Sequence, residues 1–246
     1  MSEDILVLAE QRDGVLNRST WEAVVAGQKI AKELGKEVTV LILGKDLNPV
    51  AEQVAETDVK EVLIADDEKL SEYTPDGYSA AIKQVIEKEK PHYVLFTHTY
   101  MVRDFVPKLA AALERALISD CTRYKMGDGK LVFVRQVFQG KIDADISFEG
   151  EPPYLVTFQV GAFNADDLES GSGKASIRNA EIDMAGVEIR TKVLEIFEGV
   201  KQEVDLSKAE RIVSVGRGIK KEENLEIVKQ LAEEPPDPFA TRGGCL

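Results

Sequence analysis

The residues best placed to do chemistry are Gly216, Arg217 and Gly218, which lie between an apolar run at 212–215 and an amphipathic pattern at 221–232. Two glycines let the backbone turn sharply and approach a ligand closely. A helix after such a turn directs unpaired N–H groups at the same place, which suits a phosphate, and Arg217 could pair with a pyrophosphate. The motif is short, so a tight strand–helix turn with a solvated arginine explains it equally well.

Other reactive side chains are few. His92 and His98, the two histidines, flank an expected strand at 93–97 and read as ordinary strand-end residues. Cys121 and Cys245 have no metal-ligand spacing and form no disulfide framework. Because the sequence shows no Ser/His/Asp set and no paired carboxylates, it predicts neither an enzyme nor a metal site.

Composition narrows the class of protein. The chain has 246 residues, of which 43% are hydrophobic and 30% charged, as in an ordinary globular protein. Its net charge of −13 argues against nucleic acid as a partner. No apolar run approaches the roughly 20 residues of a membrane span, and residues 1–4 carry acid where a signal peptide carries base. We therefore expect a cytoplasmic protein without membrane insertion.

The first half of the chain alternates strand and helix patterns. Continuous apolar runs predict strands covered on both faces, and apolar residues at helical spacing predict the helices between them. The predicted strands are 5–9, 38–43, 61–65 and 93–97, and the predicted helices are 17–34, 47–56, 78–90 and 104–117. Repeated strand–helix units favour an α/β fold with a mainly parallel sheet flanked by helices.

From residue 119 the pattern changes to short strands without helices between them. These strands, at 131–134, 137–138, 144–146 and 154–158, predict an antiparallel extension of the sheet. Residues 166–174 read as a flexible connection and 188–195 as a further strand. A strand from residue 212, the glycine turn and a helix then begin a second α/β domain. We therefore place one domain at 1–196, and a linker with the start of another at 197–246.

The first domain has a nucleotide-binding type of architecture but no phosphate loop. The strand at 5–9 is followed by Gln11-Arg-Asp-Gly14 and not by a G-x-G-x-x-G motif. The strand at 93–97 is followed by His98-Thr-Tyr-Met-Val-Arg-Asp104, without the spaced glycines of an ATP loop. The sequence of this domain therefore predicts no phosphate site.

Several blocks, taken in order, resemble the α subunit of electron transfer flavoprotein over about residues 4–232. The family's L-x-S-D-V-T stretch is similar to Ala116–Thr122, and its T-V-R-x-x-A-F strand is similar to Val156–Phe163. Further similar segments are Arg103-Asp104 with Pro107–Ala111, Phe133–Arg135, Phe138–Lys141, and the second-domain opening Gly216–Asn224. Val102 replaces a glycine that is usual in the family.

The resemblance implies an adenine-nucleotide-hydrolase-like first domain and an electron carrier that holds FAD together with a β subunit. It implies acyl-CoA or related dehydrogenases as electron donors, as in fatty acid β-oxidation. Gly216, Arg217 and Gly218 are the residues that it carries over as FAD contacts. The family's other FAD loops, G-A-S-R, T-G-K and G-I-S-G-A-x-Q-H, are not in the sequence, and the proline-rich end at 235–246 resembles a truncation or frameshift. We therefore expect little FAD binding by this chain alone.

Two alternatives remain open from the sequence. One is a stand-alone module of the same architecture that binds an adenine nucleotide. The other is a structural docking domain that contacts its partner through the extension at 119–163.

Overall fold

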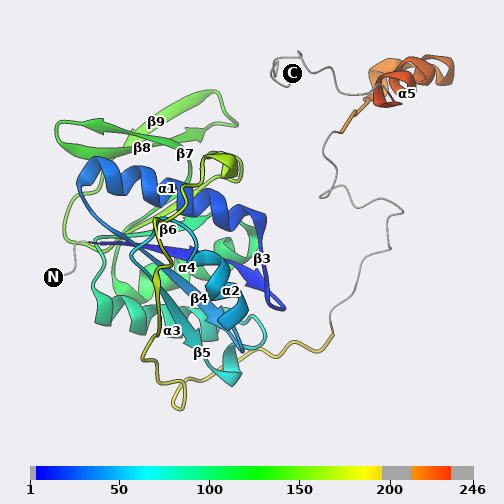
Figure 1. Cartoon of the computed structure of the whole chain (residues 1–246). Coiled ribbons are helices and arrows are strands. Elements are labelled where there is room, and N and C mark those ends of the chain that lie inside the picture. The colour runs from blue at the N-terminus through cyan, green and yellow to red at the C-terminus, as the bar shows by residue number, and fades with distance from the viewer. Residues whose placement is uncertain (1–3, 196–211, 234–246) are drawn as a thin grey trace. The chain divides into compact units, whose positions relative to one another are not determined.

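The computed structural model describes residues 4–195 and 212–233 of the chain (Figure 1). The chain divides into two compact units, 1–194 and 195–246. The functional assignment of the two predicted domains stays a prediction.

The first unit contains a nine-stranded sheet with the order β11-β5-β4-β1-β6-β10-β7-β8-β9. Its parallel part consists of β1 (Ile5–Ala9), β4 (Val38–Gly44), β5 (Glu61–Asp66), β6 (Tyr93–Thr97), β10 (Tyr154–Phe158) and the outer β11 (Ser176–Asn179). β7 (Leu117–Gly127) runs parallel to β10 and antiparallel to β8 (Lys130–Val137), which pairs with β9 (Ile142–Ile146). A short hairpin, β2 (Gln11–Arg12) and β3 (Val15–Leu16), follows β1. The predicted α/β class and four of its strands are confirmed.

Four helices cover the two faces of the sheet. Side chains alternate between faces along a strand, and in β1 Ile5 and Val7 face one apolar cluster while Leu6 and Leu8 face the other. The first cluster is completed by α1 (Arg18–Leu34) and α2 (Asn48–Val54), the second by α3 (Pro75–Glu89) and α4 (Tyr100–Leu113). Such a sheet is buried on both faces, which is why its strands read as continuous apolar runs.

Capping residues set the helix bounds. α1 begins after Asn17, whose side chain accepts the N–H of Ser19, and ends as predicted at Gly35, which has a left-handed φ of 63°. The prediction for α4 was four residues too late, since Thr99 caps its start and Glu114 takes the left-handed conformation at its end. Single-turn 3₁₀ helices occupy Glu68–Leu70 and Ala165–Asp167.

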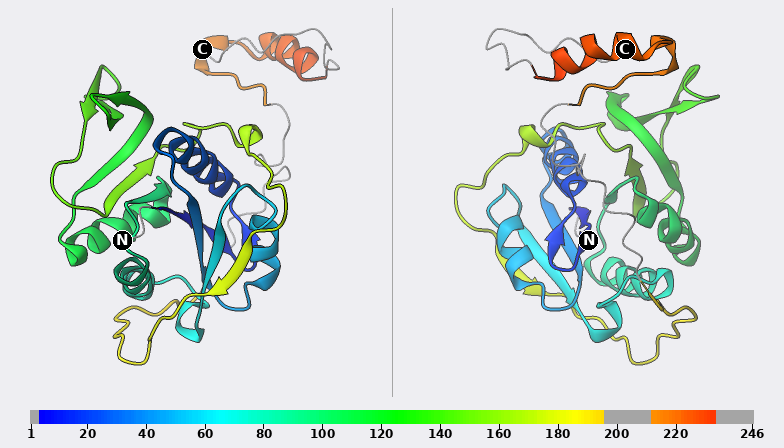
Figure 2. Two further views of the ribbon diagram at one scale, coloured as in Figure 1. Left: turned by 60° about the vertical axis from the view of Figure 1, so that its left-hand side comes forward. Right: turned by 90° about the vertical axis from the view of Figure 1, so that its right-hand side faces the viewer.

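The prediction that 154–158 belongs to the antiparallel extension was wrong. These residues form β10, which lies parallel between β6 and β7, with Leu155 opposite both Val94 and Leu117. Four of its five residues are buried, as a central position requires. Residues 117–127, of which the sequence assigned 117 to a helix end and the rest to no element, form the long strand β7. The antiparallel extension is therefore β7–β9, seen as a ribbon in Figures 1 and 2.

Residues 166–174, predicted to be a flexible connection, are fixed to the unit. The side chain of Gln28 donates to the carbonyl of Glu169 at 3.0 Å and accepts its N–H at 3.1 Å. Ser170 forms a β-bridge with Thr57. The chain then enters β11, an edge strand parallel to β5 that the sequence pattern did not predict.

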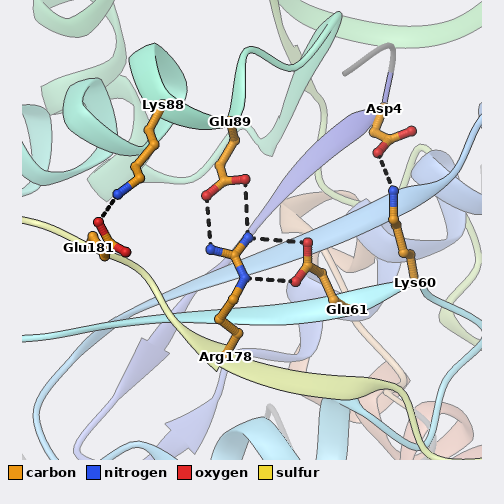
Figure 3. Close-up of polar contacts among 7 residues, drawn as sticks. All are labelled: Asp4, Lys60, Glu61, Lys88, Glu89, Arg178 and Glu181. Carbon is orange, nitrogen blue, oxygen red and sulfur yellow. Dashed lines mark hydrogen bonds and ion pairs between the residues drawn. The ribbon is translucent and has the colours of Figure 1, made fainter. Parts of the chain in front are cut away.

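Arg178 fastens β11 to the rest of the unit. Its guanidinium donates to both carboxylate oxygens of Glu61 on β5, and to both of Glu89 near the end of α3 (Figure 3). Lys88 and Glu181 form a neighbouring ion pair. The edge strand is thus held by side chains as well as by its ladder.

The segment 180–195, which we call the strap, follows β11. Lys69 donates to the carbonyls of Met184 and Val187, and Gln84 exchanges two hydrogen bonds with the backbone of Asp183. Further along, Arg190 binds Asp76 in the first turn of α3. The prediction of a strand at 188–195 was wrong. Side chains of α3 and of the segment just before it form hydrogen bonds with the backbone of the strap, so the strap does not need a neighbouring strand for those bonds.

The described part of the second unit consists of two 3₁₀ turns, Arg217–Ile219 and Glu222–Asn224, followed by α5 (Leu225–Glu233). The helix predicted at 221–232 thus begins at Leu225. The strand predicted at 212–215 is not formed, and these residues are exposed. A strand needs a neighbour for its N–H and C=O groups, and no strand among residues 212–233 offers one.

Candidate functional site

The Gly216–Gly218 turn is an open loop. Arg217 is exposed and begins the first 3₁₀ turn of the unit, with Gly216 at its cap. The left-handed residue is Lys220, with a φ of 62°, and neither glycine has a positive φ. A side chain added at Gly216 or Gly218 would meet no atom within 4 Å. The glycines therefore keep space free around Arg217 and are not required by the turn.

Donors at this turn are available for a ligand. The N–H of Ile219 is bonded to the carbonyl of Gly216, whereas the N–H groups of residues 216–218 have no partner in the described part of the chain. Arg217 forms no ion pair with a described residue either. The prediction that the following helix directs its N–H groups at this turn was wrong, since a second 3₁₀ turn lies between the Gly216–Gly218 turn and α5. An arginine and three free amides suit an oxyanion such as pyrophosphate.

A second group of polar residues lies at the carboxyl end of the parallel strands in the first unit. β4 and β6 flank β1 on opposite sides, so the direction of chain winding reverses between β1 and β6. Open α/β sheets bind ligands in the crevice at such a reversal. A depression of about 860 Å³ lies there. We call it the edge pocket, and its lining includes Glu10, His98, Tyr100, Arg103, Asp120 and Gln159.

Glu10, directly after β1, accepts hydrogen bonds from two neighbouring side chains. Thr99 donates its hydroxyl to one carboxylate oxygen at 2.6 Å, and Asn17 donates its side-chain amide to the other at 3.1 Å. Both donors are helix caps, of α4 and α1. The positive ends of two helix dipoles therefore compensate this charge, and Glu10 connects the helix starts across the pocket.

His98 and Asp120 meet at Thr157 on β10. The Thr157 hydroxyl oxygen accepts the N–H of Asp120 at 2.9 Å and lies 2.8 Å from Nδ1 of His98. Burial lowers the pKa of His98, so the imidazole is neutral at pH 7. Asp120 has a φ of 60° beside a bulge in the β7–β10 pairing. Its carboxylate has no hydrogen bond or ion pair with any residue in 4–195 or 212–233.

Two arginines stand near this group. Arg103 is exposed and lies over the ring of Tyr100 at 5.6 Å, without an ion pair to a described residue. Arg135 donates to the hydroxyl of Ser119 at 3.2 Å, while its buried Nε has no partner among the residues that the structure describes. The edge pocket therefore offers one free carboxylate, one free guanidinium and one neutral imidazole.

Sequence reasoning missed this pocket. His98 read as an ordinary strand-end residue, and Glu10 and Asp120 were not considered. The available signal was positional, because polar residues follow β1 and β6 directly and carboxyl ends of parallel strands share one edge of a sheet. Several blocks that carried the family resemblance, including Ser119-Asp120, Arg135 and Thr157, also converge here.

No group of three or more possible metal ligands occurs in 4–195 or 212–233. None of the helices in these ranges has both the length and the hydropathy to cross a membrane.

The family model and the similar proteins agree with one another. The family model for the electron transfer flavoprotein domain matches residues 5–185. The chain is 35% identical over its whole length to the electron transfer flavoprotein subunit alpha of Bacillus subtilis, and spans 74% of that protein. It is 33% identical to protein FixB of Clostridium saccharobutylicum, covering 93% of this chain and 68% of the relative.

A third relative is the acryloyl-CoA reductase electron transfer subunit beta of Anaerotignum propionicum, at 30% identity over 96% of this chain and 71% of that protein. The family match spans most of the first unit, including both the parallel sheet and the β7–β9 ribbon. The chain therefore belongs to the electron transfer flavoprotein family, and the relatives that it matches over its length include the family's α subunits.

Proposed function

We propose that this chain acts as an α-type subunit of an electron transfer flavoprotein, and that it carries electrons between a dehydrogenase and a downstream acceptor. The observation that carries the proposal is the match to an α subunit from Bacillus subtilis along the entire chain. A carrier of this kind holds a redox cofactor and needs no substrate chemistry of its own. This accords with the prediction that the chain is not an enzyme.

FAD is the cofactor that we propose, and when bound it accepts and releases the electrons. The Gly216–Gly218 turn fits part of this group, because Arg217 and three free amides suit its pyrophosphate. These residues are one wall of a site. Each charge-assisted hydrogen bond contributes about 1.5 to 3 kcal/mol, so one wall gives weak affinity, and we expect FAD to be held in a complex with a β subunit.

The β7–β9 ribbon is the surface that we propose for docking the β subunit. Phe138 is 74% exposed on it, and Ile142 and Met126 are exposed as well. Apolar side chains of this size on a projecting ribbon favour a protein contact. The relative from Anaerotignum propionicum is named for acryloyl-CoA reductase, which supports a redox enzyme that acts on CoA thioesters as a partner. That an acyl-CoA or related dehydrogenase donates the electrons stays a prediction from the family resemblance. A cytoplasmic location stays a prediction from the sequence.

The test is co-expression of the chain with a candidate β subunit, followed by FAD titration of the complex. We expect Arg217→Ala to weaken FAD binding roughly ten- to a hundredfold, since a charge-assisted contact of about 1.5 to 3 kcal/mol is lost. Arg217→Lys should give a smaller defect, because it keeps the charge and loses the planar fork. Equal FAD affinity of all three proteins would make Arg217 a solvated turn residue.

A further inference from the structure

We propose that Phe138, at the tip of the β8–β9 hairpin, is the anchor residue with which this chain binds the β subunit. Its ring enters an apolar pocket of that subunit. The inference rests on the proposed function, which supplies the β subunit as the partner and the β7–β9 ribbon as the docking surface. It adds the single side chain on which the contact depends most.

The loop that joins β8 to β9 has an unusual backbone. It consists of residues 138–141, between the paired ends of the two strands. The first three of these residues have positive φ angles, 52° at Phe138, 59° at Gln139 and 79° at Gly140. Glycine adopts such angles freely. A bulky residue does so rarely and at a cost in stability, because its Cβ crowds the following carbonyl oxygen.

Other hairpin turns of the described chain use residues that such angles favour. The β2–β3 turn is Asp13-Gly14, with φ angles of 52° and 75°. The β7–β8 turn is Asp128-Gly129, with φ angles of 50° and 76°. Aspartate followed by glycine is a preferred pair for two left-handed positions. The requirements of a turn therefore do not account for a phenylalanine at position 138.

Packing does not account for Phe138 either. Its side chain is 74% exposed, and it belongs to neither apolar cluster of the first unit. Strained backbone that is not needed for packing occurs mainly at functional sites, where the strained residue is used. The combination of backbone strain and exposure indicates that the ring has a contact outside this chain.

The surroundings of Phe138 fit a contact with a protein. Val137 and Ile142, which pair across the base of the loop, add apolar surface that is partly or largely exposed. Lys141 is exposed and forms no ion pair with a described residue. An apolar centre with an aromatic side chain and a polar rim is the usual composition of a protein interface. A carboxylate at the edge of the partner's pocket would complement Lys141.

The area of the contact also favours a protein subunit. A stable interface buries about 800 Å² on each partner, and one aromatic side chain supplies about 150 to 250 Å². The rest of the ribbon supplies the remaining area, while a few central aromatic residues carry most of the binding energy. A second copy of this chain is a poor occupant, because each copy has a net charge of −13 and the two repel each other.

The test compares the full chain with Phe138→Asn and Phe138→Tyr. Asparagine tolerates the left-handed conformation, so Phe138→Asn should raise the melting temperature of the first unit by about 2 to 4 °C. The same change should weaken binding to the β subunit of the same organism at least about tenfold, as measured by biolayer interferometry with FAD in excess. Phe138→Tyr keeps both the ring and the strain, so its melting temperature and affinity should stay near those of wild type.

Val15→Asn is the matched control, because Val15 is 69% exposed in another hairpin and has no positive φ angle. It should change neither the affinity nor the melting temperature. Wild-type affinity of Phe138→Asn, or a melting temperature no higher than that of wild type, would overturn the inference. Dimers of the chain alone that Phe138→Asn dissociates would assign the ring to a second copy and also overturn it.

Failure of the inference and failure of the proposed function give different results. If the wild-type chain did not bind the β subunit at micromolar concentration, the proposed docking would be refuted together with its anchor. If wild type and Phe138→Asn bound the β subunit equally well, only the role of Phe138 would be refuted.

Discussion

Replacing Asp76 by asparagine should loosen the strap from α3. Asp76 lies in the first turn of α3 and its side chain is only 6% exposed. It accepts hydrogen bonds from the backbone N–H of Arg190 at 3.0 Å and from that residue's guanidinium at 2.8 and 3.2 Å, and it pairs with Lys108 of α4. One carboxylate therefore connects the strap with two helices.

The cost can be derived from these contacts. Asparagine has nearly the same volume, so no cavity forms, but it removes the charge and turns an NH₂ group toward donors. A hydrogen bond to a charged group is worth about 1.5 to 3 kcal/mol. The cations left behind can hydrate, since the side chains of Lys108 and Arg190 are 41% and 68% exposed. Hydration of these cations therefore recovers part of the lost hydrogen-bond energy. We expect Asp76→Asn to lower the free energy of unfolding by about 2 to 3 kcal/mol in total.

Urea unfolding followed by tryptophan fluorescence measures this cost. Trp21, the only tryptophan of the chain, lies in α1 against the core and reports on the first unit. The control is Asp145→Asn, which breaks an ion pair with Lys125 in which both side chains are about half exposed, and which should cost at most about 1 kcal/mol. Equal losses in the two variants would refute the argument that burial of Asp76 makes its contacts strong.

The pH dependence gives a second test of the same contact. Arg190 and then Lys108 hold the pKa of Asp76 well below its usual range, so the unfolded chain binds the proton more tightly than the folded one. Its stabilisation is complete above the unfolded pKa of about 3.9 and is lost as pH falls toward the folded pKa. The difference in free energy of unfolding between wild type and Asp76→Asn should therefore be constant near neutral pH. Below about pH 4 it should shrink by about 1.4 kcal/mol per pH unit.

Two further predictions concern the core. Gly27→Ala should destabilise the first unit by about 1 to 3 kcal/mol, since a Cβ there would lie 2.8 Å from Val7. The control is Gly173→Ala, where a Cβ meets nothing within 4 Å. Equal melting temperatures of the two variants would contradict the packing argument. Burial raises the pKa of Cys121 to about 12. In a Cys245→Ser variant the native chain should therefore not react with Ellman's reagent at mildly alkaline pH until urea unfolds it. Rapid reaction of the native chain would show that the thiol is accessible.

The sequence predicted the strands of the parallel sheet because each is defined by its own residues. Ile5–Ala9 is apolar throughout, and only a strand covered on both faces explains that pattern in five residues. The antiparallel β8 was predicted as two short strands, 131–134 and 137–138, which the structure joins into one, and β9 was predicted as 144–146. Helix bounds were less accurate, since they depend on single hydrogen bonds such as the one that the Thr99 hydroxyl oxygen accepts from the N–H of Val102.

Features that depend on distant residues were not predictable in the same way. Nothing in residues 154–158 indicates that their neighbours are β6 and β7 and not β9. β11 is short and exposed, and the arginine that fastens it contacts residues far away in the sequence. The edge pocket joins Glu10, His98 and Asp120, and only the order of the strands brings these three together.

The central place of β10 has a consequence for synthesis on the ribosome. β6 is made about 60 residues before β10, which corresponds to roughly 3 to 12 s at 5 to 20 residues per second. During this interval the apolar Tyr93–Thr97 strand has one side without its final partner, and the ribbon that starts at β7 cannot yet join the sheet. Unpaired apolar edges recruit other chains. The nascent protein is therefore most vulnerable to aggregation between these two strands, and a chaperone that covers β6 would protect it at that stage.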